Sequence, residues 1–240
     1  MKLISICSQC TEELGLTEES VLWVEFEDGA YYETTCPRKH KQGFILTTQK
    51  FEVLFEFGAM ALLDGYPREA VSSFAVALER FYEYVVKAIL LHAGTAPEDL
   101  EAAWKQVSAQ SERQLGALAV LYLREYGKPA PLLSQSTTEL RNKVIHKGYI
   151  PTHTEAIEYG DAVLQHLAML YKDLYKSHYS GISKLIGIQL GKAASRAKDS
   201  KNVSTVGIAT VFSEAASKGG TTFEKALGKL ADRMKRIYKP

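Results

Sequence analysis

The feature that most constrains the fold of this chain is a change in hydrophobic spacing near Gln49. Before it, apolar residues alternate with polar ones as in β-strands, and after it they recur every three or four positions, as on one face of a helix. The clearest stripe, from Val71 to Ala88, predicts a buried helix face. We expect helices over 51–65, 67–94, 95–127, 136–148 and 152–181, each ending at a glycine.

Capping boxes mark the starts of the last three predicted helices. Each has Ser or Thr followed three positions later by Glu, so that side chains satisfy the first backbone N–H groups. The residues concerned are Thr95, Ser136 and Thr152. The helical body is therefore expected to be all-α, with antiparallel neighbours.

All three cysteines of the chain lie in the first 40 residues. Cys7 and Cys10 are separated by two residues, and Cys36 is followed by His40 after three. This spacing is typical of two zinc knuckles that supply four tetrahedral ligands, with no position open for catalysis. A module of about 45 residues has too little core to be stable alone, so one structural zinc ion and no catalytic metal are expected. Alternatively, the cysteines are free and His40 belongs to the basic surface run 38–41.

A hairpin signal lies between the two knuckles. Residues 21–26 and 31–35 have strand-like composition and flank Asp28-Gly29, a strong turn sequence. Two knuckles bracketing a hairpin form a zinc ribbon. The sequence thus divides into a zinc-ribbon-like module over 1–47, a helical domain over 48–180 and an extension over 181–240.

The extension is basic, although the whole chain carries a formal net charge of only +1. Residues 181–240 hold 12 lysines and arginines against 4 acidic residues, and the remainder holds 17 against 24. We expect amphipathic helices over 182–198 and 222–237, with 200–210 ambiguous between strand and helix. Such asymmetry suits contact with a polyanion or with the acidic body of the protein itself, and solvated helix faces are a third explanation.

The overall composition is that of an ordinary globular protein. Hydrophobic residues make up 46% and charged residues 24% of the chain. No apolar run reaches the roughly 18 residues that span a membrane. The first residues, with one lysine and a short apolar run before Cys7, do not resemble a signal peptide. We therefore expect a cytoplasmic protein without a membrane contact.

The stretch 141–149, RNKVIHKGY, holds the groups best suited to chemistry. Histidine moves a proton near neutral pH, and arginine holds a phosphate and stabilises charge in its transition state. In a helix Asn142 and His146 lie about 40° apart and share a face. Arg141 lies about 140° from His146, so it must reach around the helix or serve a neighbouring subunit. Alternatively, Asn142 and His146 are ordinary surface residues.

This Arg-Asn-x3-His-x-Gly-Tyr sequence, in the fourth of five predicted helices, resembles the motif of the HEPN superfamily. Residues 73–81 likewise resemble the long core helix of that family, and the resemblance covers about residues 48–180. It implies a mainly α fold, a five-helix HEPN-like bundle carrying the small β zinc ribbon and the basic extension.

Catalytic HEPN proteins are metal-independent endoribonucleases that commonly dimerise so that two motifs meet in one cleft. The resemblance implies that Arg141, Asn142 and His146 are catalytic and that Glu79 orients one of them, although Glu79 also reads as a solvated helix charge. The gap of four residues between Arg141 and His146 lies at the short end of the family pattern.

The implied reaction is transesterification of RNA. His146 takes the ribose 2′-hydroxyl proton, Arg141 stabilises the pentacoordinate phosphate, and Asn142 orients His146 or the phosphate. A protonated His146 of the partner subunit is the candidate acid in a homodimer. The products carry a 2′,3′-cyclic phosphate and a 5′-hydroxyl, and DNA, which lacks the 2′-hydroxyl, is not cut.

Lys143, Lys147 and Tyr149 adjoin the motif and are expected to contact RNA through charge and stacking. Such an enzyme would suit a toxin or antiviral defence effector restrained by an inhibitory antitoxin protein. Two alternatives stay open: a non-catalytic HEPN-like scaffold that binds nucleotide, nucleic acid or protein, and a zinc-ribbon adaptor that the helical body only dimerises. The complete motif favours the enzyme, whereas an acidic body that would repel RNA favours the scaffold.

Overall fold

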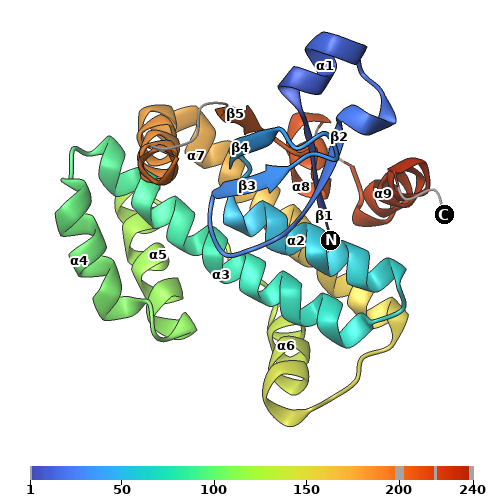
Figure 1. The fold of residues 1–240 in the computed structure, drawn as a ribbon. Helices are drawn as coiled ribbons and strands as arrows, with labels where there is room; N and C mark the ends of the chain where they lie inside the picture. The colour runs from blue at the N-terminus through green and yellow to red at the C-terminus, as the bar shows by residue number, and fades with distance from the viewer. Residues whose placement is uncertain (1, 198–202, 219–220, 238–240) are drawn as a thin grey trace. The chain divides into compact units, whose positions relative to one another are not determined.

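The structure is a computed structural model that describes residues 2–197, 203–218 and 221–237, and these are mainly helical, as predicted (Figure 1). The chain forms two compact units, unit 1 over residues 1–48 and 185–208 and unit 2 over 49–184 and 209–240. The elements are, in order, β1 (Lys2–Ile6), α1 (Ser8–Leu14), the 3-10 helix η1 (Glu18–Ser20), β2 (Val21–Glu25), β3 (Tyr31–Thr35), β4 (Lys41–Leu46), α2 (Lys50–Leu63), α3 (Pro67–His92), α4 (Pro97–Val107), α5 (Ser111–Tyr126), α6 (Gln135–Lys147), α7 (His153–Arg196), β5 (Val203–Val206), α8 (Val211–Lys218) and α9 (Phe223–Ile237).

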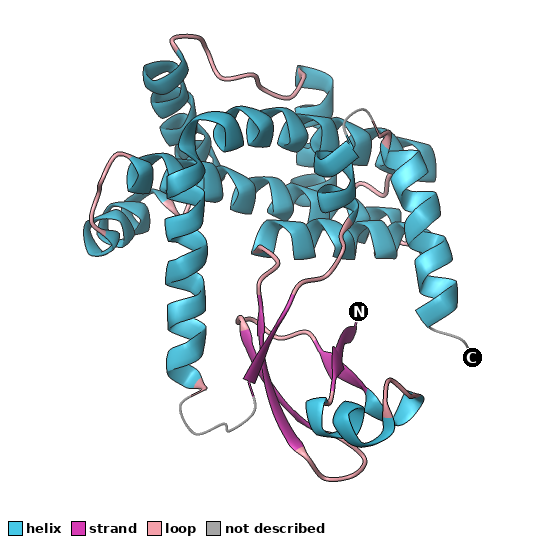
Figure 2. Ribbon diagram, turned by 90° about the horizontal axis from the view of Figure 1, so that it is seen from above, coloured by secondary structure: helices cyan, strands magenta, loops and turns pink. Residues whose placement is uncertain are grey.

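Unit 1 contains two small sheets, whose strands are magenta in Figure 2. Strand β1 pairs antiparallel with β2, and β4 lies between an antiparallel β3 and a parallel β5. The rings of Tyr32 and Phe44 stack at 5.1 Å between centroids on neighbouring strands, and both are buried. A small β region at the N-terminus is therefore present, as predicted.

The predicted hairpin between 21–26 and 31–35 is wrong, because β2 pairs with β1 and β3 pairs with β4. Five residues separate the end of β2 from the start of β3, too many for the two-residue turn that Asp28-Gly29 suggested. The connection is instead held by Tyr32. The Tyr32 hydroxyl lies within hydrogen-bonding distance of the carbonyl oxygens of Glu27, at 3.0 Å, and Gly29, at 3.2 Å, and donates to them.

Unit 2 is built on the pair of helices α2 and α3 (Figure 1). Their facing aromatic side chains are fully buried, with Phe55 and Phe74 at 4.7 Å between ring centroids and Phe51 and Phe81 at 4.9 Å. The buried stripe predicted from Val71 to Ala88 is confirmed, because its apolar members are 0–8% exposed. Edge-on and tilted aromatic contacts of this kind stabilise the core that carries the remaining helices.

One predicted helix is divided in the structure. The helix predicted over 95–127 is two helices, α4 and α5, separated by a turn at Ser108. The buried Gln114 side chain donates to the Ser108 carbonyl oxygen at 2.8 Å, which stabilises the end of α4 without a glycine or proline signal. Residues 49–184 therefore carry six helices rather than five.

Helix α7 consists of two helical stretches joined across a kink at the non-helical residue His178, close to the end expected near Gly181, and the second stretch corresponds to the helix predicted from residue 182. Gly181 acts as a point of close approach, since a Cβ there would lie 1.9 Å from the Ala88 carbonyl oxygen. The other predicted stops do adopt the left-handed conformation that favours glycine: Gly65, Gly94, Gly127 and Gly148.

Only one predicted capping box is present. Glu155 accepts from the Thr152 backbone N–H at 2.7 Å, and the Thr152 hydroxyl accepts from the Glu155 backbone N–H at 3.2 Å. Helix α4 instead begins after Ala96 with Pro97 in its first turn, and α6 is capped by Ser134. In both cases a better-placed neighbouring residue serves the helix start.

The basic extension over 181–240 is divided between the two units rather than folded as a unit of its own. Residues 203–206, part of the ambiguous 200–210 segment, form strand β5, while 200–202 lie outside the described residues, as does the end of the predicted 182–198 helix at Lys198. The predicted helix over 222–237 is confirmed as α9.

In unit 2 the part of the extension after residue 208 is attached to α2 by two carboxylates, of which that of Glu56 is buried. Glu56 accepts from the Val211 backbone N–H at 2.8 Å and from the Arg233 guanidinium, and Glu52 accepts from the Thr210 hydroxyl at 3.2 Å. Burial raises the pKa of Glu56, although the Val211 hydrogen bond and the Arg233 charge oppose the increase. An arginine of the extension therefore contacts the acidic helical body itself, one of the explanations considered for the charge asymmetry.

Candidate functional site

Helix α6 carries the Arg-Asn-x3-His motif, and its ends are well determined by local interactions. The Ser134 hydroxyl accepts from the Thr137 backbone N–H at 3.2 Å, and Gly148 ends the helix with φ of 67°. Val144 is fully buried and attaches α6 to the core. Asn142 and His146 are therefore exposed, while Arg141 is half-buried.

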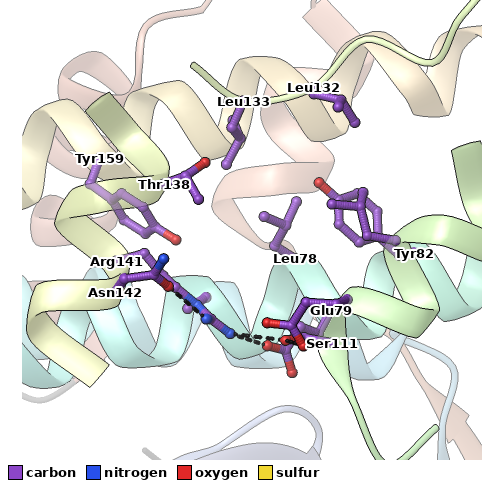
Figure 3. Close-up of a pocket in the computed structure, with 13 residues that line it drawn as sticks. Leu78, Glu79, Tyr82, Ser111, Leu132, Leu133, Thr138, Arg141, Asn142 and Tyr159 are labelled. Carbon is purple, nitrogen blue, oxygen red and sulfur yellow. Dashed lines mark hydrogen bonds and ion pairs between the residues drawn. The ribbon is translucent and has the colours of Figure 1, made fainter. Parts of the chain in front are cut away.

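The Arg141 guanidinium contacts the other motif residues and Glu79 at the same time. Its Nη2 lies 2.7 Å from Glu79 Oε1, and its Nη1 donates to Asn142 Oδ1 at 2.9 Å and lies 3.3 Å from His146 Nε2. The separation of about 140° around the helix is thus spanned within one chain, because the arginine side chain is long enough to curl toward His146. Figure 3 shows the Arg141 side chain directed toward Glu79.

The contact between Arg141 and His146 selects one form of the imidazole ring. A guanidinium only donates hydrogen bonds, so its neighbour Nε2 serves as the acceptor of a neutral ring with its proton on Nδ1. In this contact the lone pair of Nε2 is engaged by Arg141, so the guanidinium must turn toward a phosphate before Nε2 can take a proton as a general base or carry one as an acid. The geometry therefore places a titratable ring next to a permanent cation.

Ser111 and Glu112 also belong to this site, and sequence reasoning missed both. Arg141 Nη2 donates to the Ser111 hydroxyl at 3.4 Å, and that hydroxyl donates to Glu112 at 3.2 Å. The backbone N–H of Glu112 itself lowers the pKa of its carboxyl, helped by Ser111 and by the charge of Arg141 and opposed by burial. Both residues begin α5, and Ser111 lies 30 positions before Arg141, so no local pattern could have linked them to the motif.

A pocket of about 410 Å³ opens beside these groups (Figure 3). It combines the polar groups of the site with a larger apolar lining. Its lining residues are Ala75, Leu78, Glu79, Tyr82, Ser111, Glu112, Leu115, Leu132, Leu133, Thr138, Arg141, Asn142 and Tyr159.

The three residues expected to bind RNA lie outside this pocket. Lys143, Lys147 and Tyr149 are exposed on α6 and just beyond it. The Tyr149 hydroxyl donates to the Glu155 carboxylate at 3.1 Å, which raises the pKa of that phenol, while 39% of the residue surface stays accessible. An RNA base could stack on the exposed Tyr149 ring, but the Tyr149 hydroxyl is already bonded to Glu155.

Unit 1 contains a second candidate site, formed by Cys7, Cys10, Cys36 and His40. Their ligand atoms lie within 4.8 Å of one another, and the three cysteines are 0–3% exposed. Zinc bonds of about 2.3 Å to sulfur and 2.0 Å to nitrogen give tetrahedral edges of about 3.5–3.8 Å. The observed separations are 3.6 Å for Cys10–Cys36, 3.4 Å for Cys10–His40 and 3.7 Å for Cys7–His40. The group is therefore compact and buried enough to hold one metal ion.

Each half of this group lies at the end of its own strand pair. Cys7 follows β1, and its backbone N–H donates to Ser20 just before β2 at 2.8 Å. Cys36 and His40 lie between β3 and β4, where the His40 backbone N–H donates to Cys36 Sγ at 3.3 Å. Burial raises the pKa of the Cys10 thiol to about 12, so a bound cation is needed to favour its thiolate.

Within the described residues, no helix combines the length and apolar character that crossing a membrane requires. Comparison of the chain with models of protein families, with curated proteins and with solved structures finds no match.

Proposed function

We propose that this protein is a HEPN-type, metal-independent endoribonuclease whose active site is formed by Arg141, Asn142 and His146, with Glu79 as a positioning residue. One observation carries the proposal. A single guanidinium contacts Glu79, Asn142 and the His146 Nε2 within 2.7–3.3 Å, at the edge of a pocket. A cation beside a general base is what cleavage of a phosphodiester without a metal requires.

In the proposed reaction His146 Nε2 removes the proton of the ribose 2′-hydroxyl, and that oxygen forms a bond to the adjacent phosphorus. Arg141 stabilises the charge of the pentacoordinate phosphate, and Asn142 orients His146 or the phosphate. The bond from phosphorus to the 5′-oxygen then breaks, and that oxygen receives a proton. The products are a 2′,3′-cyclic phosphate and a 5′-hydroxyl.

The proton donor for the leaving oxygen is proposed to be a protonated His146 of the partner subunit in a homodimer. RNA is the substrate, and an inhibitory antitoxin protein would restrain the activity in a toxin or antiviral defence effector. Because Arg141 contacts His146 of its own chain, each subunit supplies a complete base and cation, and the dimer is needed only for the acid.

We also propose that Cys7, Cys10, Cys36 and His40 hold one structural zinc ion. Thiolate and imidazole ligands suit zinc, and the Cys10–Cys36, Cys10–His40 and Cys7–His40 separations match its tetrahedral edges. Four protein ligands leave no open position, so the ion would stabilise unit 1 and take no part in catalysis.

A non-catalytic scaffold is the second candidate function, and one observation favours it. The Arg141 charge is already paired with Glu79 at 2.7 Å, and Glu112 adds a second carboxylate nearby. A phosphate must therefore compete with the carboxylates of the site for the guanidinium. In this alternative the motif only ties α6 to α3 and α5.

The deciding experiment incubates zinc-loaded protein with labelled single-stranded RNA without added magnesium, and analyses the ends of the products. Wild type should cleave and leave cyclic phosphate ends, while His146→Ala should not. His153→Ala is a matched control, since His153 is an exposed histidine at the start of α7. Equal cleavage by wild type and His146→Ala, or no cleavage of varied RNAs by a homogeneous zinc-loaded sample, would contradict the enzyme and favour the scaffold.

A further inference from the structure

The pocket beside Arg141 is larger and more apolar than phosphate chemistry needs. Four of its lining residues are almost fully buried, Ala75 at 3%, Leu78 at 8%, Tyr82 at 6% and Tyr159 at 2% exposed. Leu132 is 57% exposed at the mouth. A phosphate would leave this apolar surface uncovered, so the shape calls for a ligand with a flat apolar part.

One polar group that lines the pocket is the Tyr159 hydroxyl. Among the described residues, no hydrogen bond involves the Tyr159 hydroxyl, although only 2% of the surface of this residue is exposed. Figure 3 shows this hydroxyl directed into the pocket, on the same side as Arg141. The hydroxyl is not among the fully buried unpaired atoms of the described residues, so it keeps surface toward the pocket and is free to bond the polar edge of a ligand.

We propose that this pocket binds one nucleobase of the RNA substrate, next to the phosphate that Arg141 contacts. The inference rests on the proposed function and names its specificity site. A nucleobase has apolar faces, which suit Leu78 and Leu115, and polar edges, which suit the Tyr159 hydroxyl. The volume of about 410 Å³ lies within the range of small-molecule sites.

The charges of the site make the base, rather than the phosphate, the main source of affinity. Arg141 faces Glu79 at 2.7 Å, and Glu112 lies close enough for Arg141 to lower its carboxyl pKa. These two carboxylates repel an isolated phosphate, whereas burying a base in the apolar part is favourable. A sugar phosphate without a base should therefore bind poorly.

The test measures binding directly by calorimetry with the full-length, zinc-loaded protein. The probes are AMP, GMP, CMP and UMP, with ribose 5-phosphate as the probe that lacks a base. At least one nucleotide should bind at one site per chain, with an affinity about tenfold or more above that of ribose 5-phosphate. Equal affinity for all five probes, or no binding of any, would overturn the proposal.

Variants locate the binding. Leu115→Trp fills the pocket from α5 and should abolish nucleotide binding, whereas Val120→Trp on the same helix should not, because Val120 is 73% exposed and lies outside the pocket. Tyr159→Phe removes one oxygen and should weaken binding about 3- to 10-fold. If Leu115→Trp fails to fold, Tyr159→Phe carries the test, and unchanged affinity in that variant would overturn the proposed contact.

A second arm distinguishes RNA from a free nucleotide. A single-stranded hexaribonucleotide of the preferred base should displace the mononucleotide from His146→Ala, which cannot cleave it. A mononucleotide that binds but is not displaced would overturn RNA as the source of the base.

The proposed base pocket and the proposed ribonuclease activity can be contradicted independently of each other. Specific binding without cleavage by wild type would contradict the enzyme and support the pocket. Cleavage by Leu115→Trp at the wild-type rate and sequence preference would contradict the pocket and leave the enzyme.

Discussion

Arg141 on α6 and Glu79 on α3 form an ion pair of 2.7 Å that joins two helices 62 positions apart in sequence. Both side chains are only partly exposed, at 18% and 24%. Because Glu79 engages Nη2, the other nitrogen, Nη1, is held facing Asn142 and His146. The pair therefore sets the orientation of the guanidinium at the candidate active site.

Removing the Glu79 carboxylate should reduce catalysis through misplacement of Arg141. We expect Glu79→Ala to lower kcat about 10- to 100-fold, because small displacements of a charge-stabilising group are costly. Glu79→Gln keeps an acceptor oxygen and should recover part of this loss. Steady-state cleavage kinetics measure both, with Glu69→Ala, an exposed position on the same helix, as control. If Glu79→Ala lowers kcat and Glu79→Gln does not partly restore it, the hydrogen bond from Arg141 to Glu79 does not position the guanidinium.

Loss of one metal ligand should empty the site in unit 1. Zinc-loaded wild type is expected to contain about one ion per chain, and Cys10→Ser should contain almost none, because the metal is held by few, mutually dependent ligands. Elemental analysis gives the stoichiometry, and thermal unfolding reports the loss of stability. Glu12→Ala, an exposed change on the same short helix α1, is the control. Full metal content in Cys10→Ser would remove Cys10 from the ligand set.

The buried His166 should make the protein less stable in acid. Burial lowers the pKa of His166 to about 4 from its ordinary value of 6.5, and the ring contacts the Tyr82 hydroxyl at 3.1 Å. As the pH falls below 6.5 the unfolded chain takes up a proton that the folded chain does not, until the pH nears 4. This contribution is therefore complete above pH 6.5 and is lost below it, by at most about 3 kcal/mol.

Denaturant unfolding between pH 7 and pH 4 measures this slope for wild type and His166→Phe. The variant keeps a ring of similar shape without a titratable nitrogen, so its slope should be smaller, whatever its absolute stability. Parallel slopes in the two proteins would assign the acid sensitivity to other groups.

The ion pair between Arg233 on α9 and the buried Glu56 should stabilise the folded protein. The Glu56 side chain is only 4% exposed and pairs with Arg233, so Arg233→Ala leaves a buried carboxylate without its cation. We expect a loss of about 2–4 kcal/mol in the free energy of unfolding. Lys229→Ala removes a lysine that is 47% exposed and lies 3.6 Å from Glu214, and should cost less than about 1 kcal/mol. Equal effects of the two changes would contradict this difference.

Two glycines in α7 should respond oppositely to alanine. A Cβ at Gly181 would lie 1.9 Å from the Ala88 carbonyl oxygen, so Gly181→Ala should destabilise by more than about 2 kcal/mol. Gly187 has no atom within 4 Å of the position of a Cβ, and Gly187→Ala should stabilise the helix by about 0.5–1 kcal/mol. Chemical unfolding compares them, and tolerance of alanine at 181 would mean that α7 can move away from α3.

Local patterns predicted much of the helical unit and the motif residues of both candidate sites. The stripe from Val71 to Ala88, the boundaries of α2, α3 and α6 and the grouping of three cysteines with His40 depend on spacing along the chain, and the structure contains all of them. The turn at Ser108 escaped prediction, because a side chain from the next helix, Gln114, stabilises it rather than a glycine or proline.

By itself, the sequence determined most of the segments that become helices, the faces they bury and the residues that form the two candidate sites' motifs, because periodicity and ligand spacing are properties of neighbouring positions. Only the tertiary structure decided which surfaces meet. It paired β2 with β1 rather than β3, divided the extension between the two units, and brought Ser111 and Tyr159 to the pocket of Arg141. An apolar helix face must be buried, but its sequence does not specify which other face covers it. Glycine is equally ambiguous in sequence, because Gly148 ends a helix with a positive φ, whereas Gly181 allows the backbone of Ala88 to approach α7 closely.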